Sequence, residues 1–220
     1  MEPESILETE SYSQFGQDIY VLELSKKNNG FFVDVGFYDG KYMSNTYLLE
    51  KKGWKGIGID AYPKNTSIRP NTIIEQCCLS DKQDDEVDFV LAGTLSGIYK
   101  NLGRHKETNR VKNAEIIKIK TSTLEKILTK NKCPNFIDYM SVDIEGSEYD
   151  VLKNFPFNTV FFVKYILVEH NQEIEKKNKI ENLLFKNGYN KDNNFKKSNI
   201  EDFYILNEKN YKQLRLDSQP

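Results

Sequence analysis

Two groups of acidic residues, each following a short apolar run, are the residues of this chain best suited to chemistry. The first group lies in Phe31-Phe32-Val33-Asp34-Val35-Gly36-Phe37-Tyr38-Asp39-Gly40, and Asp60 ends the next apolar run, residues 56–60. Short apolar runs are typical of buried parallel strands, and glycines let the backbone approach a ligand closely. Asp60 follows at about the spacing at which a carboxylate in a doubly wound fold binds a ribose diol. This group therefore predicts a nucleotide site.

The charges of this segment indicate which nucleotide it binds. A dinucleotide fingerprint needs three glycines at G-x-G-x-x-G spacing, but the segment has only Gly36 and Gly40. Asp34 and Asp39 would repel a pyrophosphate, whereas they suit the ammonium and sulfonium groups of S-adenosylmethionine (SAM). A Walker-type phosphate loop is also absent from the sequence. The pattern favours SAM over NAD or ATP.

The second acidic group follows two later apolar runs. Asp143 and Glu145 come after residues 136–142, and Glu169 and His170 end the run at 163–169. Ligands of open α/β sheets bind at the carboxyl ends of the strands, so these residues are predicted to meet beside the cofactor. His170 could act as a general base toward a substrate hydroxyl. Alternatively, Asp143 with Glu169 or His170 could bind Mg²⁺ or Mn²⁺ and lower the pKa of a bound hydroxyl. The simplest alternative is a set of strand-end caps and solvated charges.

The elements that must position these residues alternate along the chain. Alternation of short apolar runs with helical segments predicts an α/β fold, a mostly parallel sheet with helices on both faces. Seven strands are expected in this sheet, at residues 31–35, 56–59, 72–77, 136–142, 163–169, 189–191 and 203–206. Two more strands, at 87–91 and 115–120, are expected to pair or to lie at an edge. Helices are expected at 44–52, 123–130, 148–154 and 173–187, the second of them opened by the capping-box pattern of Ser122-Thr123-Leu124-Glu125.

One long segment fits neither pattern. Residues 92–112 contain three glycines and mixed charge, and they are predicted to form an irregular loop at the active site. Loops of this length inside compact domains are often functional. We expect its polar part, around Ser96, Arg104 and His105, to close over an acceptor rich in hydroxyl groups.

Bulk properties restrict the class of protein. A chain of 220 residues is most simply one domain, residues 1–220, and its net charge of -2 gives no indication of a nucleic-acid partner. Cys77, Cys78 and Cys133 lack the spacing of zinc or redox motifs and are predicted to be inert thiols in a reducing compartment. Residues 1–13 are acidic without the apolar core of a signal peptide, and no apolar run reaches the length of a membrane span. We therefore expect a cytoplasmic protein without transmembrane segments.

The ordered motifs resemble the FkbM family of SAM-dependent methyltransferases over about the first 190 residues. The resemblance is carried by residues 12–18 (YSQFGQD), 32–36 (FVDVG), 44–48 (SNTYL), 54–60 (WKGIGID), 95–98 (LSGI), 143–148 (DIEGSE) and 168–171 (VEHN). It implies a Rossmann-like class I methyltransferase fold and O-methylation, commonly of a sugar or polyketide hydroxyl. The N-terminal segment, residues 1–28, would be helical and adjacent to the cofactor.

The resemblance also implies roles for individual residues. Asp34 and Gly36 would contact the methionine end of SAM, and Asp60 would contact its ribose. Gln14 and Gln17 would lie close to the cofactor. The remaining cofactor contacts predicted on this basis are Tyr38, Asp39, Ala61, Cys78, Leu79 and Asp143, with Cys78 and Leu79 near the adenine.

Two short segments depart from the usual family pattern. Phe37 and Tyr38 stand where Ala-Asn is common, and Asp60-Ala61-Tyr62 stands where Glu-Pro-Asn is common. Tyr62 is predicted to stack against adenine. Taken together, the sequence predicts a SAM-dependent O-methyltransferase of a sugar or glycan hydroxyl, in which His170, Asp143 and Glu145 are catalytic or Asp143, Glu169 and His170 hold a metal ion. The alternatives are methylation of another small molecule or an RNA cap, and a catalytically inactive SAM-binding module.

Overall fold

The framework of the computed structural model, which describes residues 10–207, is a mostly parallel sheet of seven strands. Its strands lie in the order β10-β11-β9-β8-β1-β2-β3. Only β11 runs against its neighbours β9 and β10. The strands are β1 (Phe31–Val35), β2 (Lys55–Asp60), β3 (Thr72–Gln76), β8 (Phe136–Val142), β9 (Phe162–Glu169), β10 (Tyr189–Lys191) and β11 (Glu201–Leu206). The predicted fold class and the seven predicted strands are confirmed.

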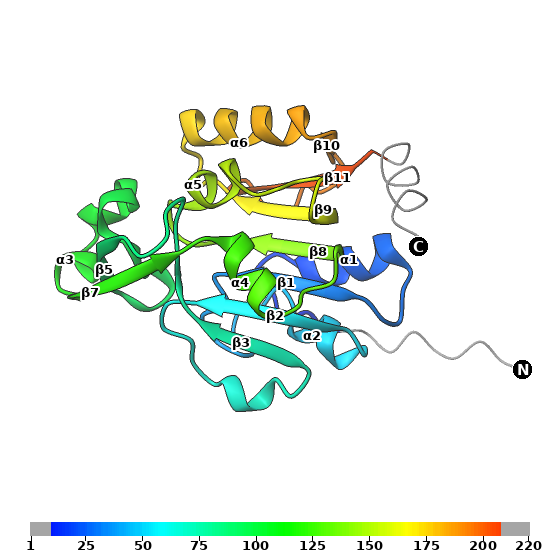
Figure 1. The fold of residues 1–220 in the computed structure, drawn as a ribbon, viewed down its shortest axis with the longest axis horizontal. Helices are drawn as coiled ribbons and strands as arrows, with labels where there is room; N and C mark the ends of the chain where they lie inside the picture. Colours follow the sequence, from blue (N-terminus) through cyan, green and yellow to red (C-terminus); the bar gives the residue numbers. More distant parts are fainter. Residues whose placement is uncertain (1–9, 208–220) are drawn as a thin grey trace, which may run out of the picture.

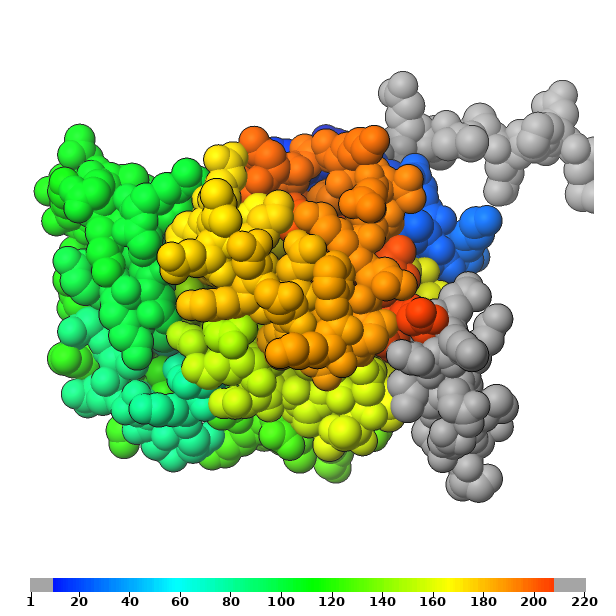
Figure 2. Space-filling view, turned by 90° about the horizontal axis from the view of Figure 1, so that it is seen from above, coloured from blue at the N-terminus to red at the C-terminus, as the bar shows by residue number. Residues whose placement is uncertain are grey.

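Helices cover both faces of this sheet (Figure 1). Because side chains alternate along a strand, Val33 and Val35 of β1 pack on one face and Phe32 packs on the other. The Val33 face packs against α4 (Leu124–Lys130), α5 (Glu148–Lys153) and α6 (Ile174–Lys186). The Phe32 face packs against α1 (Gln17–Ser25) and α2 (Tyr47–Lys51). In the space-filling view of Figure 2, α6 forms much of the near surface.

Two helix starts differ from the sequence pattern. The N-cap of α4 is Thr123, whose hydroxyl accepts a hydrogen bond from Lys126 N, and not the preceding Ser122. Helix α2 begins at Tyr47, later than the expected start at residue 44. The reason is that the Ser44 hydroxyl accepts hydrogen bonds from Thr46 N and Tyr47 N, which holds residues 44–46 in a turn.

A second, smaller sheet lies beyond the carboxyl ends of the main strands (Figure 1). Its order is β4-β7-β5-β6, with β4 (Cys78–Leu79), β5 (Glu86–Leu91), β6 (Gly97–Ile98) and β7 (Glu115–Ser122). The long antiparallel pairing of β5 with β7 confirms the expectation that these two strands pair. The expected strand at 72–77 corresponds to β3, which ends one residue earlier at Gln76, and Cys78 then opens β4 in the other sheet.

Residues 92–112 are folded, which corrects the prediction of an irregular loop. The segment contains β6, three short 3-10 helices, η2 (Gly93–Leu95), η3 (Tyr99–Asn101) and η4 (Gly103–Glu107), and the helix α3 (Asn109–Lys112). Ala92, Leu102 and Val111 are buried against Val90 of β5 in a cluster of their own. This small core holds the segment in place because it removes apolar surface from water.

The N-terminal segment is organised around a buried carboxylate. Asp18 is fully buried and accepts hydrogen bonds from Ser11 Oγ at 2.6 Å, Ser13 Oγ at 2.7 Å and Tyr12 N at 2.8 Å. The first part of the expected segment 1–28, residues 1–9, lies outside the described residues, as do residues 208–220 of the expected single domain. Within residues 10–207, no helix has the length and apolar character to cross a membrane.

Candidate active site

The register of the main sheet brings acidic side chains from four strands to one face. It aligns Asp34 with Ser141, Ser141 with Leu167, and Glu169 with Glu201. Since side chains alternate along strands, Asp34, Asp143, Glu169 and Glu201 all point toward the face covered by α1 and α2. This row lies at the carboxyl ends of the parallel strands, where open α/β sheets bind ligands.

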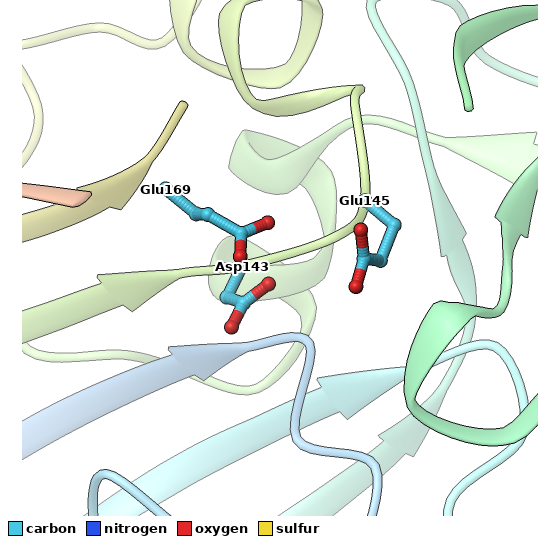
Figure 3. A group of neighbouring side chains, drawn as sticks. All are labelled: Asp143, Glu145 and Glu169. Carbon is cyan, nitrogen blue, oxygen red and sulfur yellow. The ribbon is translucent and has the colours of Figure 1, made fainter. Parts of the chain in front are cut away.

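Three carboxylates form a tight cluster at the centre of this region (Figure 3). Asp143 follows β8, Glu169 ends β9, and Glu145 lies on the turn between β8 and α5; one carboxylate oxygen of each lies within 4.8 Å of the others. Burial, followed by the surrounding charges, raises the pKa of Asp143 to about 6 and that of Glu145 to about 8. Burial and the neighbouring carboxylates also raise the pKa of Glu169 well above its usual value. Such a cluster can hold protons near neutral pH or bind a divalent cation through oxygen ligands.

The structure does not bring His170 to this cluster. Glu169 and His170 are consecutive at the end of an extended strand, so their side chains point to opposite faces of the sheet. The buried imidazole of His170 faces Asp202, with Nε2 at 3.5 Å from Oδ2, and its Nδ1 accepts a hydrogen bond from Gln172 N. The predicted metal set of Asp143, Glu169 and His170 is therefore not assembled. Glu145 takes the place of His170.

A different histidine lies beside the carboxylates. His105 of η4 places Nε2 3.4 Å from Glu145 Oε2. Burial and the nearby cations Arg104 and Lys176 lower the pKa of His105. Its segment was expected to face an acceptor, but nothing in its sequence spacing predicts contact with Glu145. The long-range packing of residues 92–112 produces that contact.

The turn that carries Glu145 is held rigidly. Glu148 is fully buried, and its Oε1 accepts hydrogen bonds from Ile144 N at 3.1 Å and Gly146 N at 2.9 Å. Its other oxygen lies 3.2 Å from Lys176 Nζ of α6. The segment 92–112 packs on the same turn, because a side chain at Gly146 would meet Asn101 O at 2.0 Å.

Gly36 forms the joint between β1 and the acidic turn. Its φ is 93°, and a Cβ atom placed there would lie 1.6 Å from the carbonyl oxygen of Asp143. The chain is held on both sides of this contact, by the bond from Asp143 N to Val35 O at 2.8 Å and by that from Gly36 N to Ile59 O at 2.9 Å. Glycine is therefore needed here for the approach of two backbone segments, whatever ligand binds nearby.

A cleft beside the cluster gathers four of the predicted cofactor contacts. Its lining includes Asp60, Ala61, Cys78 and Leu79, together with residues of the second sheet such as Ile98. Burial raises the pKa of the Cys78 thiol to about 12, so the thiol is uncharged and the lining apolar. The cleft is thus a largely apolar slot with one carboxylate at its edge.

The Asp60 carboxylate stands at the junction of this cleft with a second hollow. Its two oxygens accept hydrogen bonds from Tyr38 N at 2.9 Å and from Tyr62 N at 2.6 Å, and each oxygen keeps a further lone pair. Tyr38 and Tyr62 line the second hollow together with Asp60 and Lys64. The two tyrosines that depart from the usual family pattern therefore both face this region.

Other predicted contacts are engaged by the protein itself. Asp34 is buried and accepts a hydrogen bond from Thr46 Oγ1 at 2.6 Å, and burial raises its pKa. Asp39 accepts hydrogen bonds from Lys41 N and Tyr42 N, both at 2.9 Å, and from the Asn65 amide. Both carboxylates stabilise the loop that follows β1.

The two glutamines of the N-terminal motif differ in their surroundings. Gln17 is buried and donates from Nε2 to Glu201 Oε1 at 2.7 Å, while its own Oε1 accepts from Phe15 N. Gln14 is exposed. Gln17 therefore connects the N-terminal segment to the acidic row through β11.

These features define a class of protein. A parallel sheet with one reversed strand near its edge, helices on both faces and a cleft at the carboxyl ends of β1 and β2 constitute the Rossmann-like class I methyltransferase fold. The chain belongs to the FkbM methyltransferase domain family, whose model matches residues 34–191. The family resemblance seen in the sequence is thereby confirmed.

Two solved structures are similar in overall shape. A Plasmodium falciparum protein assigned as a ribosomal RNA methyltransferase is 14% identical with a TM-score of 0.47, over 89% of this chain and 97% of the other. A Lactococcus lactis protein assigned as a hemolysin is 11% identical with a TM-score of 0.46, over 94% of this chain and 98% of the other. No curated protein sequence matches the chain.

Proposed function

We propose that this methyltransferase uses SAM to methylate a hydroxyl group of a sugar or glycan. The observation that carries the proposal is the shared wall between the cleft and the carboxylate cluster. Ile144 and Ser147, which flank Glu145 on the acidic turn, line the same cleft as Asp60. A donor bound in the cleft and an acceptor at the cluster would therefore lie against the same turn.

The cleft offers each part of SAM a suitable environment. Asp60 can accept hydrogen bonds from two ribose hydroxyls with its free lone pairs, and Ala61, Cys78 and Leu79 supply apolar contact for adenine. Tyr62, which is half exposed, is positioned in the second hollow as a stacking surface. SAM supplies a methyl group bonded to a sulfonium, which is a good leaving group.

Residues of the β1 loop are assigned to the methionine end. Asp34 and Gly36 would act there mainly by fixing the loop, and Tyr38 and Asp39 would extend the contact surface. Asp143 lies next to Gly36 and would favour the positive charges of the donor. Gln17 contributes through Glu201.

The carboxylate cluster supplies the acid–base chemistry. A carboxylate with a pKa between about 6 and 8 accepts a proton efficiently near neutral pH, which fits Asp143 or Glu145 as general base. SAM would supply the methyl group and keep the electrons of the broken carbon–sulfur bond on its sulfur, while the carboxylate would take the proton from the acceptor hydroxyl. Alternatively, Asp143, Glu145 and Glu169 would hold Mg²⁺ or Mn²⁺, which would lower the pKa of the bound hydroxyl.

Cofactor binding is tested with one residue of the cleft. SAM affinity is measured by calorimetry for wild type, Asp60→Ala and Asp60→Asn, with Asp88→Asn as the control. Asp88 is exposed and pairs with Lys118 on the second sheet, so its substitution should not change affinity. We expect Asp60→Ala to weaken binding at least tenfold, because two hydrogen bonds are lost. Equal affinity for wild type and Asp60→Ala would rule out the ribose assignment.

The reaction is tested by transfer of a labelled methyl group to a panel of sugars, glycans, amines and capped RNA. We expect label on a sugar or glycan hydroxyl. Label on RNA or on nitrogen would contradict the proposed acceptor. SAM binding without transfer to any acceptor would indicate a binding module. Glu145→Gln should lose turnover, because it removes a carboxylate of the cluster. His170→Gln should keep more turnover, because the His170 imidazole faces Asp202 and not the cluster. Loss of activity in EDTA with recovery in Mg²⁺ or Mn²⁺ would decide for the metal.

A further inference from the structure

Asn171 connects the carboxylate cluster through its side-chain amide. This buried residue directly follows His170, and its Nδ2 donates to Glu169 Oε2 at 2.7 Å and to Glu145 Oε2 at 3.2 Å. One amide group thus bridges two carboxylates that come from different elements, the end of β9 and the turn before α5. An amide NH₂ has two donors, one for each carboxylate.

We infer that Asn171 is a positioning residue for the proposed methyl transfer, holding Glu145 and Glu169 in the arrangement that the reaction requires. The inference rests on the proposed function of the cluster. Glu145 itself has a backbone φ of 55°, which residues other than glycine adopt infrequently. Close carboxylates also repel one another. A neutral double donor offsets that repulsion without adding a charge.

The backbone around Asn171 is built to aim this amide. Asn171 and Gln172 both have left-handed conformations, with φ values of 51° and 60°. The main-chain N–H groups of His170 and Asn171 both donate to Ile200 O, at 2.7 and 2.9 Å. These bonds fix a tight turn at the point where β9 ends.

His170 supports the same turn from the opposite face. Its Nδ1 accepts the hydrogen bond from Gln172 N at 3.1 Å, and its Nε2 faces Asp202. The geometry gives His170 an indirect part in the site. It secures the turn that carries Asn171, while the carboxylates perform the proton transfer.

Three substitutions distinguish the role of the Asn171 amide from the role of Asn171 in forming the turn. Asn171→Gly keeps the left-handed backbone, because glycine adopts it readily, and removes the amide. Asn171→Ala removes the amide and strains the turn. Asn171→Asp keeps the shape and is tolerated at positive φ, but it replaces two donors by a fourth carboxylate. Asn158→Gly is the matched control, since Asn158 also has a positive φ of 58° but lies in the turn before β9, at the other end of the sheet.

The readouts are kcat and KM for the acceptor, the Kd of SAM, the melting temperature and a crystal structure of Asn171→Gly. We expect Asn171→Gly to lower kcat by about 10- to 100-fold, as is usual when support of a catalytic shell is removed. Its SAM affinity should stay within about twofold, whereas its melting temperature should fall, because two buried carboxylates lose their shared donor; kcat is therefore measured well below that temperature. Asn171→Asp should be at least as impaired. Asn158→Gly should match wild type in kcat and SAM affinity, although it also loses a side-chain hydrogen bond, from Asn158 Nδ2 to Asn187 O. The Glu145 and Glu169 carboxylates should move apart in the crystal structure.

If Asn171 only formed the turn, the kcat values of its variants would fall in the reverse order. Asn171→Gly and Asn171→Asp would then keep wild-type kcat, and only Asn171→Ala would be impaired. That order would overturn the inference, as would unchanged positions of Glu145 and Glu169 in Asn171→Gly. If the wild-type protein itself transfers no methyl group, the proposed function fails, and the crystallographic comparison still decides the role of Asn171.

Discussion

Replacement of Gly36 by alanine is the most direct test of how the two acidic groups are joined. The new Cβ would lie 1.6 Å from Asp143 O, which is far inside contact distance, and the backbone φ of 93° is unfavourable for alanine. The two nearest atoms, the carbonyl oxygen and carbon of Asp143, belong to the backbone and cannot rotate away as a side chain could. The clash can therefore be relieved only if the ends of β1 and β8 separate.

The magnitude follows from what that separation breaks. A positive φ costs alanine about 1–2 kcal/mol. Separation also breaks the hydrogen bond from Asp143 N to Val35 O, which is worth about 1 kcal/mol. We expect Gly36→Ala to lower the free energy of unfolding by about 2–3 kcal/mol.

Gly53→Ala provides the matched control. Gly53 has almost the same φ, 95°, but the nearest atom to its Cβ position, Asn28 O, lies 3.1 Å away. This variant should bear only the backbone cost of about 1–2 kcal/mol. Both are measured by urea unfolding followed by circular dichroism, with the slope of each transition compared to wild type. If Gly36→Ala is no less stable than Gly53→Ala, Gly36 is not a joint between the strands.

Three further expectations concern buried polar groups. Arg69→Met should lower the free energy of unfolding by about 3–5 kcal/mol in the same assay, because it leaves the carboxylate of Glu50 buried without its partner. Thr123→Ala should cost about 1 kcal/mol through loss of the α4 cap, and Ser122→Ala should cost less. Burial and then Asp143 raise the pKa of Glu201 to about 8, so its favourable contribution is complete below the unfolded pKa and is lost as the pH rises toward about 8. Glu201→Gln should therefore gain stability relative to wild type by a few kcal/mol between pH 5 and pH 9, and a pH-independent difference would contradict this.

The sequence predicts the main sheet well because its strands carry a strong local signal. Parallel strands buried on both faces appear as short apolar runs, and residues 31–35 and 136–142 coincide with β1 and β8. The rule for ligand sites at carboxyl ends then places Asp60, Asp143 and Glu169 correctly at one edge of the sheet. These inferences require only order along the chain and the direction of the strands.

Contacts that depend on tertiary packing could not be predicted from the order of residues along the chain. His105 reaches Glu145 only because residues 92–112 fold onto the acidic turn, and no local pattern encodes that contact. The prediction that the His170 side chain lies beside that of Glu169 could have been avoided, because consecutive side chains of a strand point to opposite faces of the sheet. Asn171 carried a weak signal, because asparagine is enriched at positive φ and it lies just beyond the end of a strand.

The structure also changes which residues support a nucleotide site. Asp34 and Asp39 suggested a sulfonium ligand by their charge, yet both are satisfied by Thr46 and by the loop's own donors. Asp60 has free lone pairs at the edge of an apolar cleft, so it is better placed than Asp34 or Asp39 to accept hydrogen bonds from a ligand. The β1 loop then acts chiefly as a support. It holds Asp60 through Tyr38 N and meets Asp143 at Gly36, and in this way it fixes the position of the cleft relative to the carboxylate cluster.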